Sequence, residues 1–397
     1  MKSNFTLIKW LLLLAVIVCW AQVTHLSAQI SGYPAGRNQR AEVSQWMGLV
    51  KVTVNYSSPS VKRHGSSKDR TGEIWGKLVP YGMSENPYRV GSTMPEKMPW
   101  RSGANENTTI TFSHDVTIEG QKLSAGTYGF HTIPDSTEWT IIFSKNPKSW
   151  GSFFYDPAMD ALRVKVKPQG AEFHNDLTFE FTERELASTT LALVWEKLRV
   201  PIKLAVPNIA DVHLAQIRLE LTSGKGFGWQ DYLNGVRFCL NSYKGNYDEA
   251  LEWINRSLEC NTLWSDLAAT PININFITLQ TKAQVLVRLG RMKQADSVIA
   301  AAINHPTATA DGISQYGNFL LAEKKKEEAL KVFQKNETKF PAAWSSLWGL
   351  ANGYSATGDL KKALKYAQQA LPIAPDDEKE DIKAAVEKLK ANKSFVD

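Results

Sequence analysis

Cysteine is scarce in this chain, with three residues among 397. Cys19 lies in an apolar run near the N-terminus, so only Cys239 and Cys260 remain in the rest of the chain. A helical hairpin that turns at Gly245 places these two on different helices, roughly 9 Å and roughly 22 Å from the turn at about 1.5 Å per residue. A disulfide requires Cα atoms within about 7 Å. The sequence therefore predicts two free, buried thiols that pack as small apolar side chains.

A large excess of charge of one sign is also lacking. The formal net charge is +6 and becomes +4 without residues 1–28, which contain two lysines and no acid. Lys324-Lys325-Lys326 is followed at once by Glu327-Glu328, a pattern typical of a solvated helix face. So mild a charge over so long a chain does not indicate a nucleic-acid partner.

Motifs of the common catalytic and cofactor sites are absent. The sequence has no Walker loop, no Gly-x-Ser-x-Gly elbow, no His-Glu-x-x-His and no Cys-x-x-Cys pair. The histidines His64, His114, His131 and His174 do not lie at the spacing of a metal-ligand pair. The sequence thus indicates no cofactor and no metal, and leaves open a zinc site assembled from distant strands.

Long apolar runs are confined to the N-terminus. Lys2 and Lys9 precede the run at residues 10–20, and the small-residue exit Leu26-Ser27-Ala28 follows it. This order is typical of a secretory signal peptide, here residues 1–28, that is cleaved before Gln29. We therefore expect an exported protein that is periplasmic, secreted or part of the cell envelope.

Two other readings of the N-terminus are weaker. A membrane anchor requires about 20 apolar residues, and Gln22, Thr24 and His25 interrupt the run too early. A lipoprotein site requires Gly or Ala before its cysteine, and Cys19 follows Val18. No second apolar segment is long enough to span a membrane, so no span is expected after removal of the signal.

Residues 45–205 alternate apolar and polar side chains with a period of two, as half-buried strands do. In the first run, Val50, Val52, Val54 and Tyr56 alternate with polar residues. The alternation recurs at residues 110–112, 116–118, 128–130, 139–143, 162–166, 177–181, 191–195 and 200–204. Short strands separated by Gly, Pro, Asn and Asp turns predict an all-β antiparallel sandwich or jelly roll. Residues 29–44 are expected to be a linker, and residues 57–108 a long connection that covers part of the sandwich or one of its ends.

The second half of the chain repeats a helical-hairpin pattern. Ala295, Ala329 and Ala363 lie 34 residues apart, which is the tetratricopeptide period. A glycine stands five residues before two of these alanines, and Lys324 takes that place in the third copy. The small residues Ala283, Gly317 and Ala351 are expected where the paired helices approach closely.

A fourth copy of the pattern contains Ala250, 45 residues before Ala295, which predicts an 11-residue insertion at about 260–271. We expect four tetratricopeptide-like repeats over residues 229–375 and a charged capping helix and tail over 376–397. Residues 206–228 are expected to contain a Gly-rich linker and a helix at 209–221 that packs the array onto the sandwich.

Several short motifs in the β half resemble those of one known family. They are Ser57-Ser58-Pro59-Ser60, Trp75-Gly76-Lys77, Pro80-Tyr81-Gly82, Trp100-Arg101-Ser102-Gly103, Ala125-Gly126-Thr127-Tyr128 and Trp150-Gly151. Over about residues 42–204 the chain resembles the domain of unknown function 2911. The resemblance implies an export signal and, as in some members, continuation into helical repeats. It implies no activity, cofactor or catalytic residue. Residues 83–99 separate two motifs that are nearly adjacent in many members.

The best candidate ligand site in the β half is the segment that holds Arg101, Asn105 and Glu106, with Tyr81 and Trp75 from the preceding loop. Arg101 could bind an anion and Glu106 could accept a hydrogen bond from a hydroxyl of a polar ligand. The alternative is that Arg101 and Glu106 pair with each other or bond to the backbone, and only fix the 57–108 connection.

The candidate partner site is the concave face of the repeats. The repeat register directs these side chains into it: Gln280, Gln284, Arg288, Ser314, Asn318, Ser345, Trp348 and Asn352. Asn318 and Asn352 occupy equivalent positions and could bond to the backbone of an extended peptide, and Trp348 is expected to be an exposed anchor. Arg288 is the only cation in this set, which disfavours a clamp for acidic C-termini. The alternative is that this face packs on the sandwich.

Two classes of function remain open. The first is an exported binding or scaffold protein whose repeats hold a peptide or protein partner and whose β domain holds a polar ligand. The second is a periplasmic hydrolase with its active site on the rim of the sandwich, built from Glu106 and a distant His or Asp. The lack of a catalytic motif favours the first.

Overall fold

The computed structural model describes residues 38–62, 67–89, 94–260 and 273–396. The predicted signal peptide with its cleavage site before Gln29, His64 and all but the first residue of the insertion predicted at about 260–271 lie outside these ranges. The chain divides into two compact units, one that ends at Pro207 and one that begins at Asn208.

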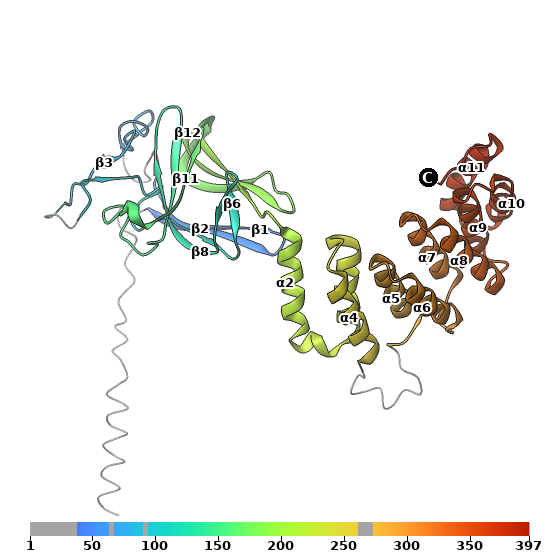
Figure 1. The fold of residues 1–397 in the computed structure, drawn as a ribbon. Helices are drawn as coiled ribbons and strands as arrows, with labels where there is room; N and C mark the ends of the chain where they lie inside the picture. Colours follow the sequence, from blue (N-terminus) through green and yellow to red (C-terminus); the bar gives the residue numbers. More distant parts are fainter. Residues whose placement is uncertain (1–37, 63–66, 90–93, 261–272, 397) are drawn as a thin grey trace, which may run out of the picture. The chain divides into compact units, whose positions relative to one another are not determined.

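The first unit contains two antiparallel sheets (Figure 1). The strands of the larger are β1 (Gln39–Met47), β2 (Val50–Ser58), β5 (Thr109–Phe112), β8 (Gly126–Ile133), β9 (Trp139–Ser144) and β10 (Asp160–Val166), in that order across the sheet. The strands of the smaller, again in spatial order, are β11 (Gln169–Thr182), β12 (Ser188–Ala205), β6 (Val116–Ile118) and β7 (Gln121–Leu123). This arrangement confirms the predicted antiparallel all-β class.

Aromatic rings from both sheets fill the core between them. The ring of Tyr56 on β2 lies 4.9 Å from that of Phe179 on β11, and Phe130 on β8 lies 5.7 Å from the same ring. The backbone N–H of Phe179 also donates to the Tyr56 hydroxyl, at 3.4 Å. Alternation of side chains along each strand directs these rings inward, and burial of each contributes about 1.5–3 kcal/mol.

Two strand boundaries differ from the sequence expectation. β1 begins at Gln39, within the stretch expected to be a linker at 29–44. Its side chains are mostly exposed and only Met47 is fully buried, so the strand shows little apolar alternation in the sequence. The strands expected at 191–195 and 200–204 form one strand, β12. Glu196 lies between them with φ +54°, and the β11–β12 register shifts near His174, so the strand bends where a break was expected.

The 57–108 connection lies against the sandwich, as predicted. It contains a small hairpin of β3 (Ser84–Glu85) and β4 (Lys97–Met98). The N–H of Val61 donates to the carbonyl of Asn175 at 2.7 Å, and Trp100 and Thr132 exchange two backbone hydrogen bonds of 2.8 Å. These bonds place the motif at Trp100 on the rim of the larger sheet.

The second unit is a succession of helices (Figure 1). They are α2 (Ile209–Leu221), α3 (Trp229–Phe238), α4 (Tyr247–Glu259), α5 (Phe276–Arg288), α6 (Met292–Asn304), α7 (Ala310–Ala322), α8 (Lys326–Lys339), α9 (Trp344–Ala356), α10 (Leu360–Ala370) and α11 (Asp376–Lys390). Helices α5, α7 and α9 begin 34 residues apart, and so do α6, α8 and α10. The predicted tetratricopeptide period is therefore confirmed.

Small residues allow the paired helices to pack closely. Ala295, Ala329 and Ala363 are fully buried. A Cβ atom added at Gly317 on α7 would lie 2.2 Å from the ring of Phe333 on α8, so only glycine fits there. These are the positions at which the sequence pattern required small side chains.

The turns between paired helices use left-handed backbone. Gly290 and Gly358 have φ of +71° and +90°, and Lys324 adopts φ +59° at the equivalent position. In the α3–α4 hairpin, Lys244 and Asn246 adopt this conformation, and Gly245 between them does not. A short π-helix, Cys239–Tyr243, extends α3 before this turn.

The ends of the array pack on their neighbours. Leu214 of α2 lies in the same core as Leu233 and Val236 of α3, so this helix, expected to join the array to the sandwich, packs within the helical unit. Ile382 and Val386 of α11 cover the last hairpin, as expected of a capping helix.

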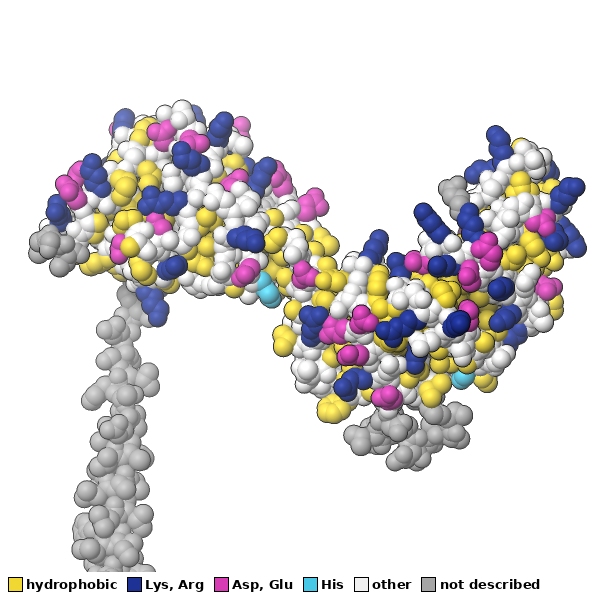
Figure 2. Space-filling model, viewed as in Figure 1, with side chains coloured by type: hydrophobic (Ala, Val, Ile, Leu, Met, Phe, Trp, Pro, Cys, Tyr) yellow, Lys and Arg dark blue, Asp and Glu magenta, His cyan; other side chains and the backbone are white. Residues whose placement is uncertain are grey.

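The two cysteines that the structure describes are free, but only Cys239 is buried and Cys260 is half-exposed. Cys260 is the C-cap residue of α4. Within the described ranges, no helix is both long and apolar enough to cross a membrane. On the face shown in Figure 2, Lys and Arg side chains are interspersed with Asp and Glu over both units.

Candidate functional site

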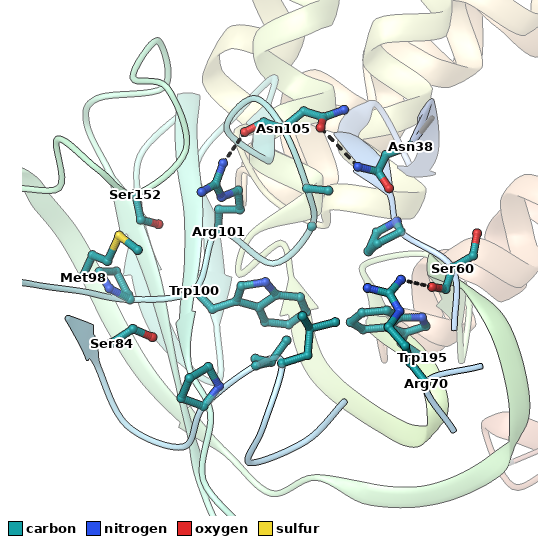
Figure 3. Close-up of a pocket in the computed structure, with 17 residues that line it drawn as sticks. Asn38, Ser60, Arg70, Ser84, Met98, Trp100, Arg101, Asn105, Ser152 and Trp195 are labelled. Carbon is teal, nitrogen blue, oxygen red and sulfur yellow. Dashed lines mark hydrogen bonds between the residues drawn. The ribbon is translucent and has the colours of Figure 1, made fainter. Parts of the chain in front are cut away.

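A cavity of about 440 Å³ lies at the rim of the sandwich, beneath the 57–108 connection (Figure 3). Its described lining comprises Asn38, Pro59, Ser60, Arg70, Leu78, Val79, Pro80, Ser84, Met98, Pro99, Trp100, Arg101, Gly103, Ala104, Asn105, Ser152 and Trp195. Most of these residues come from the connection, so the sequence motifs of that segment form one wall. A cavity of this size is typical of small-ligand sites.

Four indoles pack together at this cavity. Trp100 and Trp195, which line it, are stacked with centroids 6.2 Å apart and 17° between planes. Trp75 lies edge-on to both, at 5.8 Å and 5.7 Å, and Trp139 of β9 lies 5.3 Å from Trp75. Such perpendicular contacts favour rigid packing. The candidate residue Trp75 therefore supports the cavity wall from behind.

The Arg101 side chain is held by contacts with its neighbours, and a glycine leaves room for it. Its Nη1 donates to the carbonyl of Asn105, and its guanidinium lies 4.7 Å from the ring centre of Phe153. Gly151 has φ +56°, and a Cβ atom there would lie 2.4 Å from the guanidinium. The Trp-Gly motif is thus needed to make room for Arg101.

The charge on Arg101 has no carboxylate partner among the residues that the structure describes. Burial lowers the pKa of this guanidinium, and arginine side chains in proteins are effectively always protonated. Asn105, in a left-handed conformation with φ +56°, accepts from Asn38 Nδ2 at 3.1 Å, and its own Nδ2 is buried with no partner among the described residues. An unused amide donor therefore lies within the wall on this side of the cavity.

Glu106 and Tyr81 do not line this cavity. Glu106 pairs with Arg40 and accepts from the Ser57 hydroxyl at 3.3 Å, beside a separate hollow of about 160 Å³. Burial raises the pKa of Glu106, but the hydrogen bond and charge of Arg40, a backbone hydrogen bond and the Ser57 hydroxyl together outweigh it, so the pKa is lowered overall. Tyr81 is half-exposed and its ring lies over Gly76. The structure thus brings Arg101, Asn105 and Trp75 together and separates Glu106 and Tyr81 from them.

A buried pair that the sequence analysis missed lies beside the cavity. His131 Nδ1 and Ser152 Oγ share a hydrogen bond of 2.9 Å, and both residues are about 1% exposed. Burial, then the charge of Arg101, lowers the pKa of His131 to about 4. Burial of His131 follows from its place in β8, but its pairing with a loop serine 21 residues away leaves no sequence signal.

The repeats contain a second pocket, of about 310 Å³. Its described lining comprises Asp311, Ser314, Gln315, Asn318, Trp344, Ser345, Trp348, Gly349, Asn352 and Glu378. Five of these, Ser314, Asn318, Ser345, Trp348 and Asn352, were expected from the repeat register. The acids Asp311 and Glu378 were not, because one lies in the first turn of α7 and the other in the capping helix.

Hydrogen bonds fix the polar floor of the repeat pocket. Asn352 Nδ2 donates to Asn318 Oδ1 at 3.3 Å, so the equivalent amides bond to each other. Ser314 Oγ donates to the Ser345 carbonyl at 2.7 Å and accepts from Asn336 Nδ2 at 2.9 Å. The Ser345 hydroxyl is buried and has no partner in the described chain. The pocket thus keeps one unused hydroxyl and the outward side of the exposed Asn318.

Trp348 was expected to be an exposed anchor, and the structure corrects this. Its indole is half-buried and stacks on Phe395, from the segment after α11. Tail residues carry no periodic signal, so the sequence did not place Phe395 here.

The remaining groove candidates lie apart from the pocket. Arg288 pairs with Glu323 at 2.9 Å and packs against the rings of Tyr247 and Phe319. Gln280 and Gln284 are half-buried on α5 and are not part of the pocket lining. Arg288 is therefore a structural cation that joins neighbouring repeats.

Comparison with known proteins found one family model that matches part of the chain. Residues 38–204 match the model of a family described as a protein of unknown function, DUF2911, which confirms the resemblance seen in the sequence motifs. No curated protein matches the sequence.

Several solved structures of tetratricopeptide proteins are similar to part of the chain. YrrB, described as a TPR protein with an unusual peptide-binding site, is 20% identical, with a TM-score of 0.29, over 46% of this chain and 84% of its own. The C-terminal part of a TPR repeat-containing protein from Cytophaga hutchinsonii is 15% identical, with a TM-score of 0.32, over 46% of this chain and 67% of its own. Pseudomonas aeruginosa pilF is 18% identical, with a TM-score of 0.30, over 43% and 70%.

Proposed function

We propose that this chain is an exported binding protein whose repeats hold a peptide segment of a protein partner in the pocket between α7 and α9. The observation that carries the proposal is the stacking of Phe395 on Trp348, with ring centroids 5.1 Å apart. An aromatic side chain from an irregular segment already lies against this indole. A partner peptide with an aromatic residue would make the same contact.

The rest of the pocket suits the backbone and charge of such a peptide. The exposed Asn318 amide offers a hydrogen bond to a peptide group. Asp311 and Glu378 line the pocket, and no Lys or Arg is among its described lining residues. The expected partner segment is therefore aromatic with a basic residue beside it, and not an acidic C-terminus.

A peptide library displayed on phage tests this function on the full chain carrying Phe395→Ala, which vacates Trp348. Enrichment of peptides with an aromatic residue near Lys or Arg is the expected result. Selection that enriches no sequence, or peptides without an aromatic residue, would count against the proposal.

Export is part of the same proposal. It rests on the basic start, the apolar run at residues 10–20 and the small-residue exit before Gln29. Mass spectrometry of the chain from its native cells should give a mature N-terminus at Gln29. An intact Met1 or a lipid-modified Cys19 would contradict export by this route.

The alternative of a periplasmic hydrolase has one observation in its favour, the Ser152–His131 pair beside the sandwich cavity. A histidine with a pKa of about 4 is a poor general base at neutral pH, and Glu106 faces away from this cavity. The geometry therefore favours binding. Covalent labelling of Ser152 by a fluorophosphonate would instead support the hydrolase.

A further inference from the structure

Two arginines are among the lining residues of the sandwich cavity. Its described lining includes Arg70 and Arg101, and neither Asp nor Glu. Arg70 donates to the carbonyl of Ser60 across the cavity from Arg101 (Figure 3). The cavity thus concentrates positive charge although the whole chain is only mildly basic.

Arg101 has no acidic partner among the residues that the structure describes. Its guanidinium is half-buried, donates to the Asn105 carbonyl and lies over the Phe153 ring. Withdrawal of a charge from water is costly unless the charge is paired, and a ring face offsets only part of that cost. A carboxylate entering the cavity would supply the missing partner, with two oxygens for the guanidinium.

Part of the cavity wall is flat and apolar. Trp100 and Trp195 line it as a stacked pair, and Pro59, Pro80 and Pro99 are also part of its lining. Flat rings of ligands pack favourably on indoles. A volume of about 440 Å³ is at the lower end of the range for small-ligand pockets, which suits a compound of one or two rings.

We propose that this cavity binds a small ring compound that carries a carboxylate, with the carboxylate on Arg101 and the ring against Trp100. Asn105 provides a further amide on the same wall. Glu106 takes no part, because it pairs with Arg40 outside the cavity. This site belongs to the sandwich and is independent of partner binding by the repeats.

Two sources supply such a ligand, an acidic sugar or an aromatic acid. Saturation-transfer NMR on the full chain distinguishes them with four probes: glucuronate and its neutral counterpart glucose, and benzoate and its neutral counterpart benzyl alcohol. At least one acid should give saturation transfer while its neutral counterpart gives none. Preference for glucuronate or for benzoate then identifies the ring.

Variants test the role of the charge. Arg101→Gln should weaken binding of the preferred acid at least ten-fold. Asn105→Asp has the same shape and keeps the acceptor for Asn38, but its carboxylate competes for Arg101, so it should weaken binding similarly. Glu106→Gln is the matched control and should bind as the parent does.

Two results would overturn the proposal. One is binding of neither acid, or equal binding of acid and neutral compound, by the parent protein. The other is unchanged affinity for the acid in Asn105→Asp, the variant expected to retain the fold, whatever Arg101→Gln does to stability.

Discussion

The ring of Phe395 stacks on the indole of Trp348, with centroids 5.1 Å apart and 11° between the planes. The same segment is tied to α9, because the hydroxyls of Ser394 and Ser355 share a hydrogen bond of 2.9 Å and the Phe395 N–H donates to Ser355 Oγ at 3.2 Å. The segment after the capping helix thus covers the aromatic wall of the repeat pocket, and a partner peptide must displace it.

Removal of the Phe395 ring should therefore tighten peptide binding. A tethered segment competes at an effective concentration of the order of millimolar, so Phe395→Ala should bind a selected peptide about three- to ten-fold more tightly than the parent. Fluorescence anisotropy of the labelled peptide measures the ratio. Lys393→Ala changes an exposed neighbour and is the control. Equal affinities of Phe395→Ala and parent would show that the segment does not compete.

The exposed amide of Asn318, which Asn352 holds in place, should contribute a hydrogen bond to the bound peptide. Asn318→Ala with Asn352→Ala should weaken binding by about 1 kcal/mol, or roughly five-fold. Gln280→Ala with Gln284→Ala removes two amides outside the pocket and should leave the affinity unchanged. If both double variants bind alike, the amides do not contact the peptide.

The turn at Lys324 should be strained. This residue adopts φ +59°, where the equivalent positions carry Gly290 and Gly358. A left-handed conformation costs a residue with a Cβ atom about 1 kcal/mol relative to glycine. Lys324→Gly should raise the free energy of unfolding of the helical unit by about that amount in urea titrations, whereas Lys324→Ala keeps the Cβ atom and should not. A lower midpoint for the glycine variant would contradict this.

His131 should make the sandwich less stable in mild acid. Its pKa is lowered to about 4, first by burial and then by Arg101, whereas histidine in an unfolded chain titrates near 6.5. Between these values the unfolded chain binds a proton that the folded chain does not. The contribution of neutral His131 is therefore complete above about pH 6.5 and is lost as the pH falls toward 4, to an extent on the order of 3 kcal/mol.

Comparison with His131→Gln isolates this effect, because glutamine can still bond to Ser152 but does not titrate. Chemical unfolding at pH 7 and pH 4.5 should show a smaller acid-induced loss of stability in the variant. Equal losses in the two proteins would mean that His131 can be protonated in the fold.

The helical half was predictable because its period fixes orientation as well as fold. Once Ala295, Ala329 and Ala363 set the register, the side chains on the inner face of α7 and α9 followed, and five of them meet in one pocket. Arg288 departed from that set because Glu323 on the next repeat binds it, a contact that depends on rotamers and not on periodicity.

The sandwich site was predictable only in part. Alternation located most strands, but the direction of Arg101 and Glu106 depends on the left-handed residues Ser102 and Asn105 between them. No local sequence pattern marks these conformations. Arg101 and Glu106 were therefore expected at one site, although Arg101 lines the cavity and Glu106 lies beside a separate hollow. The stacking of Phe395 on Trp348 could not be predicted for a similar reason, because the sequence of an irregular tail does not indicate what the tail contacts.

The most direct test of the central claim is the affinity of a library-selected peptide for Phe395→Ala with and without Trp348→Ala, measured by anisotropy on full chains. Loss of an indole stack of about 1.4 kcal/mol predicts roughly ten-fold weaker binding in the double variant. Trp46→Ala, an exposed tryptophan of the sandwich, is the control and should have no effect, and circular dichroism should show that all variants keep their helical content. Equal peptide affinity in Phe395→Ala with Trp348 present and with Trp348 replaced would contradict the assignment of this pocket as the partner site.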